Sequence, residues 1–598
     1  MARARRSDGV ADCAPLASQV PPGERALGQT RVGRRTHDAR GLDRTLPVTD
    51  RTARVPYRIL VTDDIDAEGV ALLAAEPELA VDEVPTLPRD ELLARIGGYD
   101  ALVGRSATRI SPELLRAAPR LAVVGRAGVG VDNIAVDLAT ELGIAVINAP
   151  AGNSVAVAEL FFGVLLGLLR HIGHADQSMH GGGWDRSALM GSELRGRTLG
   201  IVGLGRIGGE IAGRAHAFGM SVVAYDPYVG DARFHATRTR RAATLDELLS
   251  HALVLTVHTP LTDETRGMIG AREIGRLAPG AIVANLARGG IVDERALVDA
   301  LHRGHLAGAA LDVFTTEPLS ADHALRAAPN LMLTPHIGAS TVEAQRSVAV
   351  DVCRAVRDAL LRGELSRSIN AASIDDGRGG NVRPALVLAR QLAAVGRALL
   401  ANRGARAVDR IEVSPGDALS GAREALLAAA ALGVLAPVVA HERLNLINAR
   451  ALAAARGIAL STTEGAADPP AVEHGAADYA LAVRLTGGGQ DLTVAGVAHP
   501  ATVAPRITRI GAFDVDIHPR GTLLILTNRD VPGVIGRVGT VLGAAGVNIA
   551  EYHQARLAQG GEALAAVAVD GGVGDDVRHA LLALPDVHSA TVVPLLTE

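Results

Sequence analysis

The chain has 598 residues, 48% of them hydrophobic, 21% charged and 2% aromatic, with a formal net charge of −5. This length predicts three to four domains, and the nearly balanced charge and scarce aromatic side chains give no reason to expect a nucleic-acid or other polyanionic partner. The sequence contains no lysine, which excludes lysine Schiff-base chemistry and Walker-type phosphate binding.

Residues 1–55 are rich in arginine, aspartate, glycine and proline and show no apolar periodicity. A stretch such as RVGRRTHDARGLDRT cannot bury a hydrophobic face, so we expect a disordered or spurious N-terminal extension. An arginine-rich transit peptide is the alternative, and the interspersed aspartates argue against it. No charged segment followed by an apolar one opens the chain, which argues against a secretory signal.

Two features favour a cytoplasmic location. The two cysteines, Cys13 and Cys353, provide no disulfide framework, as expected in a reducing compartment. The longest apolar run, ALLAAAALGVLAPVVA at 425–440, is interrupted by Pro437 and is too short to span a bilayer. We therefore expect a buried helix there and no membrane partner.

From residue 57 onward, short apolar segments alternate with amphipathic ones. The predicted strands include YRILV, ALVGRS, LAVVGRAG, TLGIVGLG, SVVAYDP, LVLTVHTP, AIVANLAR, GAALDVF and LMLTPH. Nearly continuous apolar strands separated by amphipathic helices are typical of parallel sheets covered on both faces. The predicted fold class is α/β, with doubly wound, Rossmann-like domains over this part of the chain.

The segment TLGIVGLGRIGGEIA at 198–212 predicts a dinucleotide-binding turn. Gly203, Gly205 and Gly208 have the G-x-G-x-x-G spacing between a predicted strand and a predicted helix. The first glycine permits the tight turn, the second lets backbone approach a pyrophosphate, and the third lets the helix pack on the strand. The helix N-terminus, with Arg206 beside it, would bind the phosphates.

Asp226 ends the next predicted strand, at the place where a carboxylate accepts hydrogen bonds from ribose hydroxyls. A carboxylate there repels a 2′-phosphate, so the expected cofactor is NAD rather than NADP. The alternative is a turn residue before Pro227 with no ligand. Because several predicted strands precede the glycine turn, the nucleotide-binding domain is inserted within, or follows, another α/β domain.

Three polar side chains follow later strands: Arg288 in IVANLARGGIVDE, Glu317 in GAALDVFTTEPL and His336 in LMLTPHIGAS. Ligands of doubly wound folds bind at the carboxyl ends of strands, so the three are expected to converge. A guanidinium grips a carboxylate through two hydrogen bonds. A carboxylate on one imidazole nitrogen fixes the tautomer, and the other nitrogen takes a proton as hydride leaves the substrate.

Each of these residues also has a purely structural alternative. Arg288 suits a surface ion pair, Glu317 a solvated loop, and His336 a core position bonded to a backbone carbonyl. Their occurrence together, in this order, favours a hydride-transfer site.

The pattern changes near residue 370. DDGRGGN at 375–381 is typical of a linker, and residues 382–519 mix helix and strand without a motif that indicates chemistry; Arg506, Arg509 and His518 suggest at most a weak anion site. From residue 521 to the end, a β-α-β-β-α-β order predicts a ferredoxin-like unit.

The segments GLGRIG, NLARGGIVDERAL, ALDVFTTEPL and TPHIGAST closely resemble the D-isomer-specific 2-hydroxyacid dehydrogenases, over about residues 57–370. Within that family, GRSATRI, VVGRAGVGVDNI and NAPAGNSVAVAEL, with the long C-terminal extension, are similar to the long bacterial members. Those members oxidise 3-phospho-D-glycerate to 3-phosphooxypyruvate with NAD, in the first committed step of serine biosynthesis.

The resemblance implies a role for each matching residue. Arg288 corresponds to the substrate-binding arginine, Glu317 to the partner of the catalytic histidine, and His336 to the acid/base; no metal is implied. Substrate contacts fall on Arg105, Ser106, Asn153 and Arg288. Cofactor contacts fall on Thr108, Gly203, Gly205, Arg206, Ile207, Gly208, Asp226, Thr259, Ala287, Asp312, His336, Gly338 and Ala339.

The resemblance also implies a domain organisation. After the extension at 1–55, residues 56–152 and 336–370 would form the substrate-binding domain, with an NAD-binding Rossmann domain at 153–335 between them. An α+β intervening domain at 371–519 and an ACT regulatory domain at 520–598 would follow.

NRDVPGVIGRVGTVLGAAGVNI carries the resemblance to the ACT domain. It implies that Asp530 and Asn548 bind an effector amino acid, L-serine, across a dimer of such domains within a homotetramer. The alternative is a unit that only dimerises. Asn528 stands where an aromatic residue or histidine is expected.

Two other functions stay open. A glyoxylate or hydroxypyruvate reductase would act on a smaller, unphosphorylated acid, but such enzymes generally end near the His336 segment. A non-catalytic, NAD-sensing corepressor would use the same fold without needing Arg288, Glu317 and His336 together.

Overall fold

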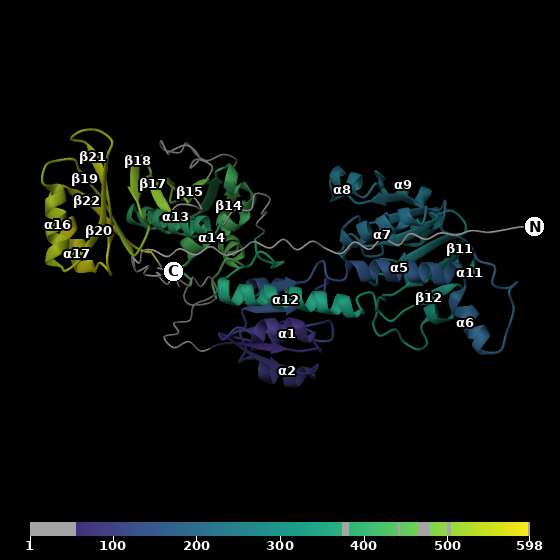
Figure 1. Cartoon of the computed structure of the whole chain (residues 1–598). Helices are drawn as coiled ribbons and strands as arrows, with labels where there is room; N and C mark the ends of the chain where they lie inside the picture. Colours follow the sequence, from purple (N-terminus) through teal and green to yellow (C-terminus); the bar gives the residue numbers. More distant parts are fainter. Residues whose placement is uncertain (1–55, 373–381, 440–442, 464–478, 499–503, 596–598) are drawn as a thin grey trace, which may run out of the picture. The chain divides into compact units, whose positions relative to one another are not determined.

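The structure is a computed structural model that describes residues 56–372, 382–439, 443–463, 479–498 and 504–595 (Figure 1). The predicted N-terminal extension and the linker at 375–381 lie outside these residues. The described part of the chain contains four β-sheets, and each is considered by itself.

The first sheet has five parallel strands in the order β2-β1-β3-β4-β5. Its central strands are buried on both faces because helices cover both. One face packs on α1 and on α12, a long helix from much later in the chain, and the other face packs on α2, α3 and α4. The bounds are β1 Tyr57–Val61, α1 Ala67–Ala74, β2 Leu79–Glu83, α2 Arg89–Ile96, β3 Ala101–Gly104, α3 Pro112–Ala117, β4 Val123–Arg126, α4 Val136–Glu141, β5 Ala145–Asn148 and α12 Val342–Arg362.

Local signals explain where α12 begins and ends. The Thr341 hydroxyl caps its first turn by accepting from the Ala344 N–H, and Gly363 ends it in the left-handed conformation. Gly69 lets α1 pack closely against α12, since a Cβ at Gly69 would lie 2.7 Å from the backbone of Ala349 in α12. A helix from beyond the second sheet thus completes the core of the first.

The second sheet has seven parallel strands in the order β12-β11-β10-β9-β6-β7-β8. The strand order reverses between β6 and β9, which is where ligands bind in doubly wound sheets. The bounds are α5 Ser154–Leu169, α6 Ile172–His180, β6 Thr198–Val202, α7 Arg206–Ala217, β7 Ser221–Tyr225, α8 Asp231–Ala236, β8 Arg240–Arg241, α9 Leu245–His251, β9 Val254–Val257, α10 Ala271–Arg276, β10 Ala281–Asn285, α11 Glu294–His302, β11 Leu306–Leu311, the 3₁₀ turn Ala324–Ala327 and β12 Leu331–Leu333. The two sheets confirm the predicted α/β class.

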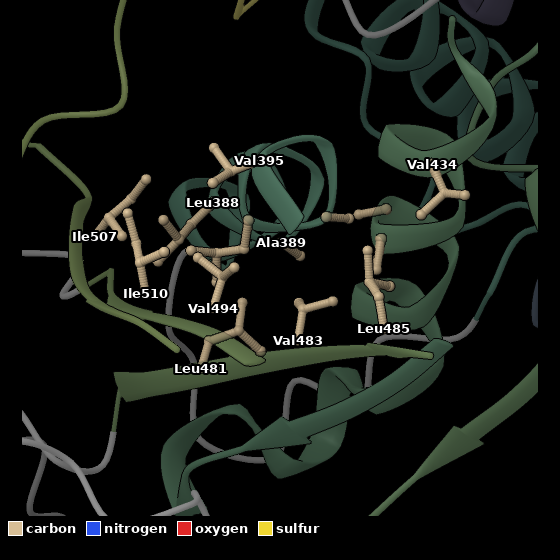
Figure 2. Close-up of a cluster of buried hydrophobic side chains, with 14 of the residues drawn as sticks. Leu388, Ala389, Val395, Val434, Leu481, Val483, Leu485, Val494, Ile507 and Ile510 are labelled. Carbon is tan, nitrogen blue, oxygen red and sulfur yellow. The ribbon is translucent and has the colours of Figure 1, made fainter. Parts of the chain in front are cut away.

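The third sheet is mostly antiparallel, in the order β14-β13-β15-β16-β17-β18. Leu388 and Ala389 of α13 face Val483 and Val494 of the sheet in a shared core (Figure 2). The bounds are α13 Arg383–Asn402, β13 Arg410–Pro415, a 3₁₀ turn at Asp417–Ala422, α14 Arg423–Leu435, α15 Ala449–Ala455, β14 Ala459–Thr462, β15 Ala480–Gly487, β16 Gln490–Val497, β17 Arg506–Ile510 and β18 Phe513–Ile517.

Two helical stretches here, Arg383–Asn402 and Asp417–Leu435, are long and apolar enough to cross a membrane by length and composition alone, as is the bent pair α5–α6 if it is counted as one span. Within the most apolar window of each of the two stretches, 50% and 67% of the residues are buried inside the fold. Their apolar side chains pack on the sheet and on each other, which accounts for their hydrophobicity without a bilayer.

The fourth sheet is antiparallel, in the order β20-β21-β19-β22. Both helices pack on one face of it, through Val534, Val538 and Leu581. The elements follow one another as β19 Thr522–Arg529, α16 Val534–Ala544, β20 Ile549–Arg556, β21 Glu562–Val569, α17 Asp575–Leu582 and β22 Val587–Pro594. This is the predicted ferredoxin-like arrangement.

Candidate active site

The glycine turn between β6 and α7 has the geometry of a dinucleotide-binding loop. Gly203 has φ +92°, and a Cβ there would lie 2.6 Å from the carbonyl oxygen of His258. At Gly208 a Cβ would lie 2.2 Å from the Gly203 carbonyl oxygen, so this glycine lets the helix pack against the turn. Nothing lies within 4 Å of a Cβ at Gly205, which leaves open space beside the backbone where a pyrophosphate would approach.

Asp226 lies beside this turn and its carboxylate is fixed. One oxygen accepts from the Leu204 N–H at 2.8 Å and the other from the Tyr228 N–H at 2.9 Å. Nearby, two buried polar atoms, Thr259 Oγ1 and His258 Nδ1, have no hydrogen-bond partner. Unsatisfied buried groups are uncommon and often mark a ligand position. The residues present therefore fit NAD, and Arg206 and Ile207 contribute the first turn of α7.

The His258 ring packs edge-on against Phe161, with ring centres 6.4 Å apart. The residue is partly buried, and desolvation lowers its pKa to about 3. Its Nε2 is 2.8 Å from the Thr256 hydroxyl. The carbonyl oxygen of His258 lies against Gly203 and its ring is held by Thr256, so this histidine supports the turn.

The structure brings Glu317 and His336 together. Their Oε2 and Nδ1 atoms are 2.8 Å apart, and the other Glu317 oxygen accepts from the Phe314 N–H at 3.0 Å. This pairing leaves His336 Nε2 for a substrate. His336 also has φ +54°, a strained conformation for a residue with a side chain, and such strain concentrates at functional sites.

Asp312, predicted from the resemblance as a cofactor contact, holds the His336 loop. It is buried, and its carboxylate accepts from the Thr334 hydroxyl at 2.6 Å and from the N–H groups of Ile337 and Gly338 at 2.8 Å each. The three donors lie before and after His336 in the chain, so their hydrogen bonds to Asp312 hold the backbone on both sides of the imidazole. The cofactor contacts at Gly338 and Ala339 stay predictions.

Arg288 lies in a turn stabilised by Asn285, whose side chain accepts from the Ala287 N–H and donates to the Arg288 carbonyl. The guanidinium donates to Asp132 Oδ2 at 2.8 Å and to the Ala287 carbonyl. Among the described residues it makes no hydrogen bond to Glu317 or His336. The structure thus pairs two of the three predicted catalytic residues, Glu317 and His336, with each other, and it pairs Arg288 with Asp132.

The loop that carries Arg105 and Ser106 is organised by Asp63, which the sequence analysis missed. Asp63 is buried and accepts from the N–H groups of Arg105 and Thr108 at 2.8 and 2.9 Å. Its other oxygen accepts from the Thr108 hydroxyl at 2.7 Å, and Asn133 donates to the Arg105 and Thr108 carbonyls. The Thr108 hydroxyl is therefore already bonded, and its predicted cofactor contact remains a prediction. Asp63 lies two residues after the end of β1, so the expectation that functional residues lie at the carboxyl ends of strands could have indicated it.

Arg126 is a second residue that the sequence analysis missed. It ends β4 and is largely buried, its Nε has no partner, and burial followed by repulsion from Arg288 lowers its pKa to about 10. Two further buried atoms without partners, Asn153 Oδ1 and Ser154 Oγ, lie at the start of α5. Such atoms are suited to a polar ligand, which agrees with the predicted substrate contact at Asn153.

The two predicted effector residues do not contact one another. Asp530 accepts from Arg556 and from the Gly560 N–H, each at 3.2 Å, and Asn548 donates to Asp570 at 2.7 Å. These contacts lower the pKa of Asp530, the Gly560 N–H first and Arg556 second. Both side chains are satisfied within the chain.

The suggested anion site at Arg506, Arg509 and His518 is not supported. Arg506 pairs with Asp516 and with Glu551, Arg509 pairs with Asp514, and His518 contacts Glu551 at 3.2 Å. These carboxylates neutralise the positive charge that an anion would need. Within the described ranges, no three or more histidine, cysteine, aspartate or glutamate side chains form a group that could hold a metal ion.

Comparison with known proteins identifies relatives of one family. The family described as D-isomer specific 2-hydroxyacid dehydrogenase, NAD binding domain, matches residues 162–338. The D-3-phosphoglycerate dehydrogenase of Bacillus subtilis is 36% identical over 540 residues, covering 90% of this chain and 100% of the relative. That of Mycobacterium tuberculosis is 38% identical over 551 residues, covering 90% and 99%. Among solved structures, the TT0316 protein from Thermus thermophilus is 36% identical with a TM-score of 0.48, covering 52% of this chain and 99% of that one.

Proposed function

Because the chain belongs to the D-3-phosphoglycerate dehydrogenases of the D-isomer specific 2-hydroxyacid dehydrogenase family, we propose that it oxidises 3-phospho-D-glycerate to 3-phosphooxypyruvate with NAD. The observation that carries this proposal is the Glu317–His336 pair at 2.8 Å on the sheet that holds the glycine turn. It supplies an oriented base for the hydroxyl proton beside a site that fits NAD.

The residues of the chain divide the reaction between them. Arg288 binds the substrate carboxylate in place of Asp132, and this holds the substrate carbon in position for transfer. His336 Nε2 accepts the hydroxyl proton, and Glu317 stabilises the imidazolium that forms. Bound NAD supplies the hydride acceptor. Asp312 and the strained His336 backbone keep the imidazole in place.

A phosphate group distinguishes this substrate from simpler hydroxy acids. Arg105 and Arg126 are the cations proposed to bind it, with Ser106 and Asn153 as neutral donors. Arg126 is suited to the role because its Nε is buried and without a partner. In a chain without lysine, guanidinium groups are the side chains that stay cationic at neutral pH, and they can bind phosphate through two hydrogen bonds.

The two alternatives predict different activities. A glyoxylate or hydroxypyruvate reductase would not need the region after residue 370, whereas the relatives match 90% of the chain. A non-catalytic NAD sensor would not need an oriented His336. The test is NADH formation from 3-phosphoglycerate and NAD, followed by absorbance. Reduction of glyoxylate without NADH formation from 3-phosphoglycerate would favour the first alternative, and no turnover of any hydroxy acid the second.

The C-terminal region, residues 371–598, is proposed to regulate the enzyme. In this proposal residues 56–152 with 336–370 bind substrate, 153–335 bind NAD, 371–519 form the intervening domain and 520–598 the ACT domain. L-Serine, the end product of the pathway, binds at Asp530 and Asn548 and inhibits. A titration of the initial rate with L-serine tests this, since an unchanged rate at saturating concentration contradicts it.

We also propose a cytoplasmic homo-oligomer, a tetramer. Its support is the segment that follows α5, where large apolar side chains are exposed: Ile172 and Met179 at 54% each, Trp184 at 77% and Met190 at 81%. Large exposed apolar side chains that gather in one segment are typical of interaction surfaces. The measurement is the mass of the full chain by light scattering, and a monomer at micromolar concentration would contradict the proposal.

A further inference from the structure

Arg233 is a residue of α8 that no step of the proposed mechanism uses, yet its side chain reaches the glycine turn. Its Nε donates to the carbonyl oxygen of Leu204 at 3.0 Å, and its Nη2 donates to that of Gly205 at 2.6 Å. These are two successive carbonyls of the segment GLGRIG. A single guanidinium therefore bonds to both peptides that surround Gly205.

The helix that carries Arg233 is itself anchored. Phe234, the next residue, is buried in the core formed by β6, β7 and α7. The Arg241 guanidinium lies 5.1 Å from the centre of the Phe234 ring and pairs with Asp231 at the start of α8. Arg233 thus reaches the turn from a fixed element, so that its two hydrogen bonds restrain the turn.

Gly209 provides the space for this side chain. A Cβ at Gly209 would lie 2.1 Å from Nη2 and 2.9 Å from Cζ of Arg233. Any other residue at position 209 would displace the guanidinium from the carbonyls. At Gly213, one turn further along α7, nothing lies within 4 Å of a Cβ. Of these two glycines in α7, only Gly209 is therefore required to make room for Arg233.

The orientation of the carbonyls determines where the neighbouring amides point. In a trans peptide the C=O of one residue and the N–H of the next point in opposite directions. With the Leu204 and Gly205 carbonyls directed toward Arg233, the N–H groups of Gly205 and Arg206 are directed away from it. In the described part of the chain, neither N–H donates to a backbone carbonyl outside the helix. A charge-assisted bond to each carbonyl also polarises the peptide and strengthens its N–H as a donor.

We propose that Arg233 is a positioning residue for NAD: it fixes the two peptides whose N–H groups bind the pyrophosphate, and Gly209 is glycine in order to admit it. Arg233 acts through the backbone and does not touch the cofactor. On the other side of the turn, the Leu204 N–H donates to Asp226. The peptide ahead of Leu204 and the peptide after it are thereby restrained by side chains of opposite charge.

The test is the dissociation constant of NADH, measured by fluorescence titration of the full chain without a hydroxy acid. The result is therefore independent of the substrate assignment. Arg233→Ala is expected to raise the dissociation constant about tenfold, as is typical for loss of charge-assisted hydrogen bonds. Gly209→Ala is expected to do the same by displacing the guanidinium. Arg233→Lys keeps one donor and recovers part of the affinity.

The double variant gives the sharper result. Gly209→Ala combined with Arg233→Ala is expected to bind NADH no more weakly than Arg233→Ala alone, because the group that the methyl displaces is already absent. Gly213→Ala on the same helix and Arg240→Ala on β8 are the matched controls, and both should keep the wild-type constant.

A role in stability alone would lower the unfolding temperature of the cofactor-free protein and leave the dissociation constant unchanged. The proposal is overturned by a folded Arg233→Ala variant whose constant lies within about twofold of wild type. It is also overturned if the effects of Gly209→Ala and Arg233→Ala simply add. Should Arg233→Ala fail to fold, Gly209→Ala and Arg233→Lys provide the same test.

Discussion

The candidate active site and the candidate effector site differ in how their polar atoms are satisfied. Around the first, Asn153, Ser154, Thr259 and Arg126 each have a buried polar atom without a partner. In the second, the two residues expected to hold the effector are already paired: Asp530 accepts from Arg556 and Gly560, and Asn548 donates to Asp570. The buried polar atom without a partner there is Oδ1 of the neighbouring Asn528.

This difference bears on how each site would bind a ligand. Unsatisfied buried groups cost free energy until a ligand pairs with them, so the active site gains hydrogen bonds on binding. At the effector site, Asp530 and Asn548 must exchange bonds that they already have, so the net gain from these two residues is smaller. We therefore expect substitutions in the first site to have large effects and substitutions in the second to have small ones.

The largest effect is expected for His336→Ala. Loss of a positioned acid/base typically costs about 10² to 10⁴ in rate, so turnover should fall by that factor while the NADH dissociation constant stays unchanged. Turnover and NADH fluorescence titrations measure the two quantities. His302→Ala, an exposed histidine on α11, is the control. Normal turnover in the His336 variant would remove this residue from the mechanism.

A smaller but distinct effect is expected for Asp312→Asn. One of the two carboxylate oxygens becomes an amide that no longer accepts from the His336 loop, and hydrogen bonds to charged groups contribute about 1.5 to 3 kcal/mol. Turnover should fall roughly 10- to 100-fold with little change in NADH affinity. Weakened NADH binding with normal turnover would instead indicate that Asp312 contacts the cofactor directly, as the family resemblance implies.

A third effect concerns the loop that Asp63 holds. Asp63→Ala leaves the buried Thr108 N–H without its acceptor and frees the loop that carries Arg105. We expect the KM for 3-phosphoglycerate to rise about tenfold, since about 1.4 kcal/mol corresponds to that factor, with a smaller change in turnover. Asp64→Ala, at the exposed neighbouring position, is the control. An unchanged KM would mean that the loop does not contact substrate.

The smallest effect on catalysis is expected for Asp530→Ala. Basal turnover should stay within about twofold of wild type, because the residue lies directly after β19 and its side chain hydrogen-bonds to Arg556 and the Gly560 N–H of the same unit. Inhibition by L-serine should weaken severalfold. Asp575→Ala, an exposed aspartate at the start of α17, is the control. Unchanged serine sensitivity would assign the C-terminal unit a purely structural role. It would also mean that Asp530 and Asn548 do not form a ligand site that can be compared with the active site.

Residues with a local signal were predictable from the sequence. The glycine spacing, Asp226 after its strand, and the strand-end positions of Glu317 and His336 are all local patterns, and the parallel sheets follow from apolar strand segments. Partners far away in the chain were not predictable. Asp63 holds a loop about 45 residues later, and Glu551 neutralises Arg506 from 45 residues away. No periodicity or spacing indicates such contacts, and for this reason the anion-site hypothesis failed.

The sequence also could not show which role a matching residue takes. Thr108 and Asp312 fall on positions that suggest cofactor contacts, yet the hydroxyl of the first is bonded to Asp63 and the carboxylate of the second to the His336 loop. Arg233 carried no motif at all. Its contact with the glycine turn depends on where α8 packs, which is a property of the folded core.

The placement of α12 has a consequence for synthesis of the protein. This helix supplies Val348, Val352 and Val356 to the core of the first sheet, together with Ile59 and Val103, but it leaves the ribosome only after the entire seven-stranded sheet. The first five strands therefore emerge with one apolar face covered only in part, by α1. The inserted sheet can fold before the sheet that precedes it is complete. During translation, the second unit to be synthesised is the first able to bury its core.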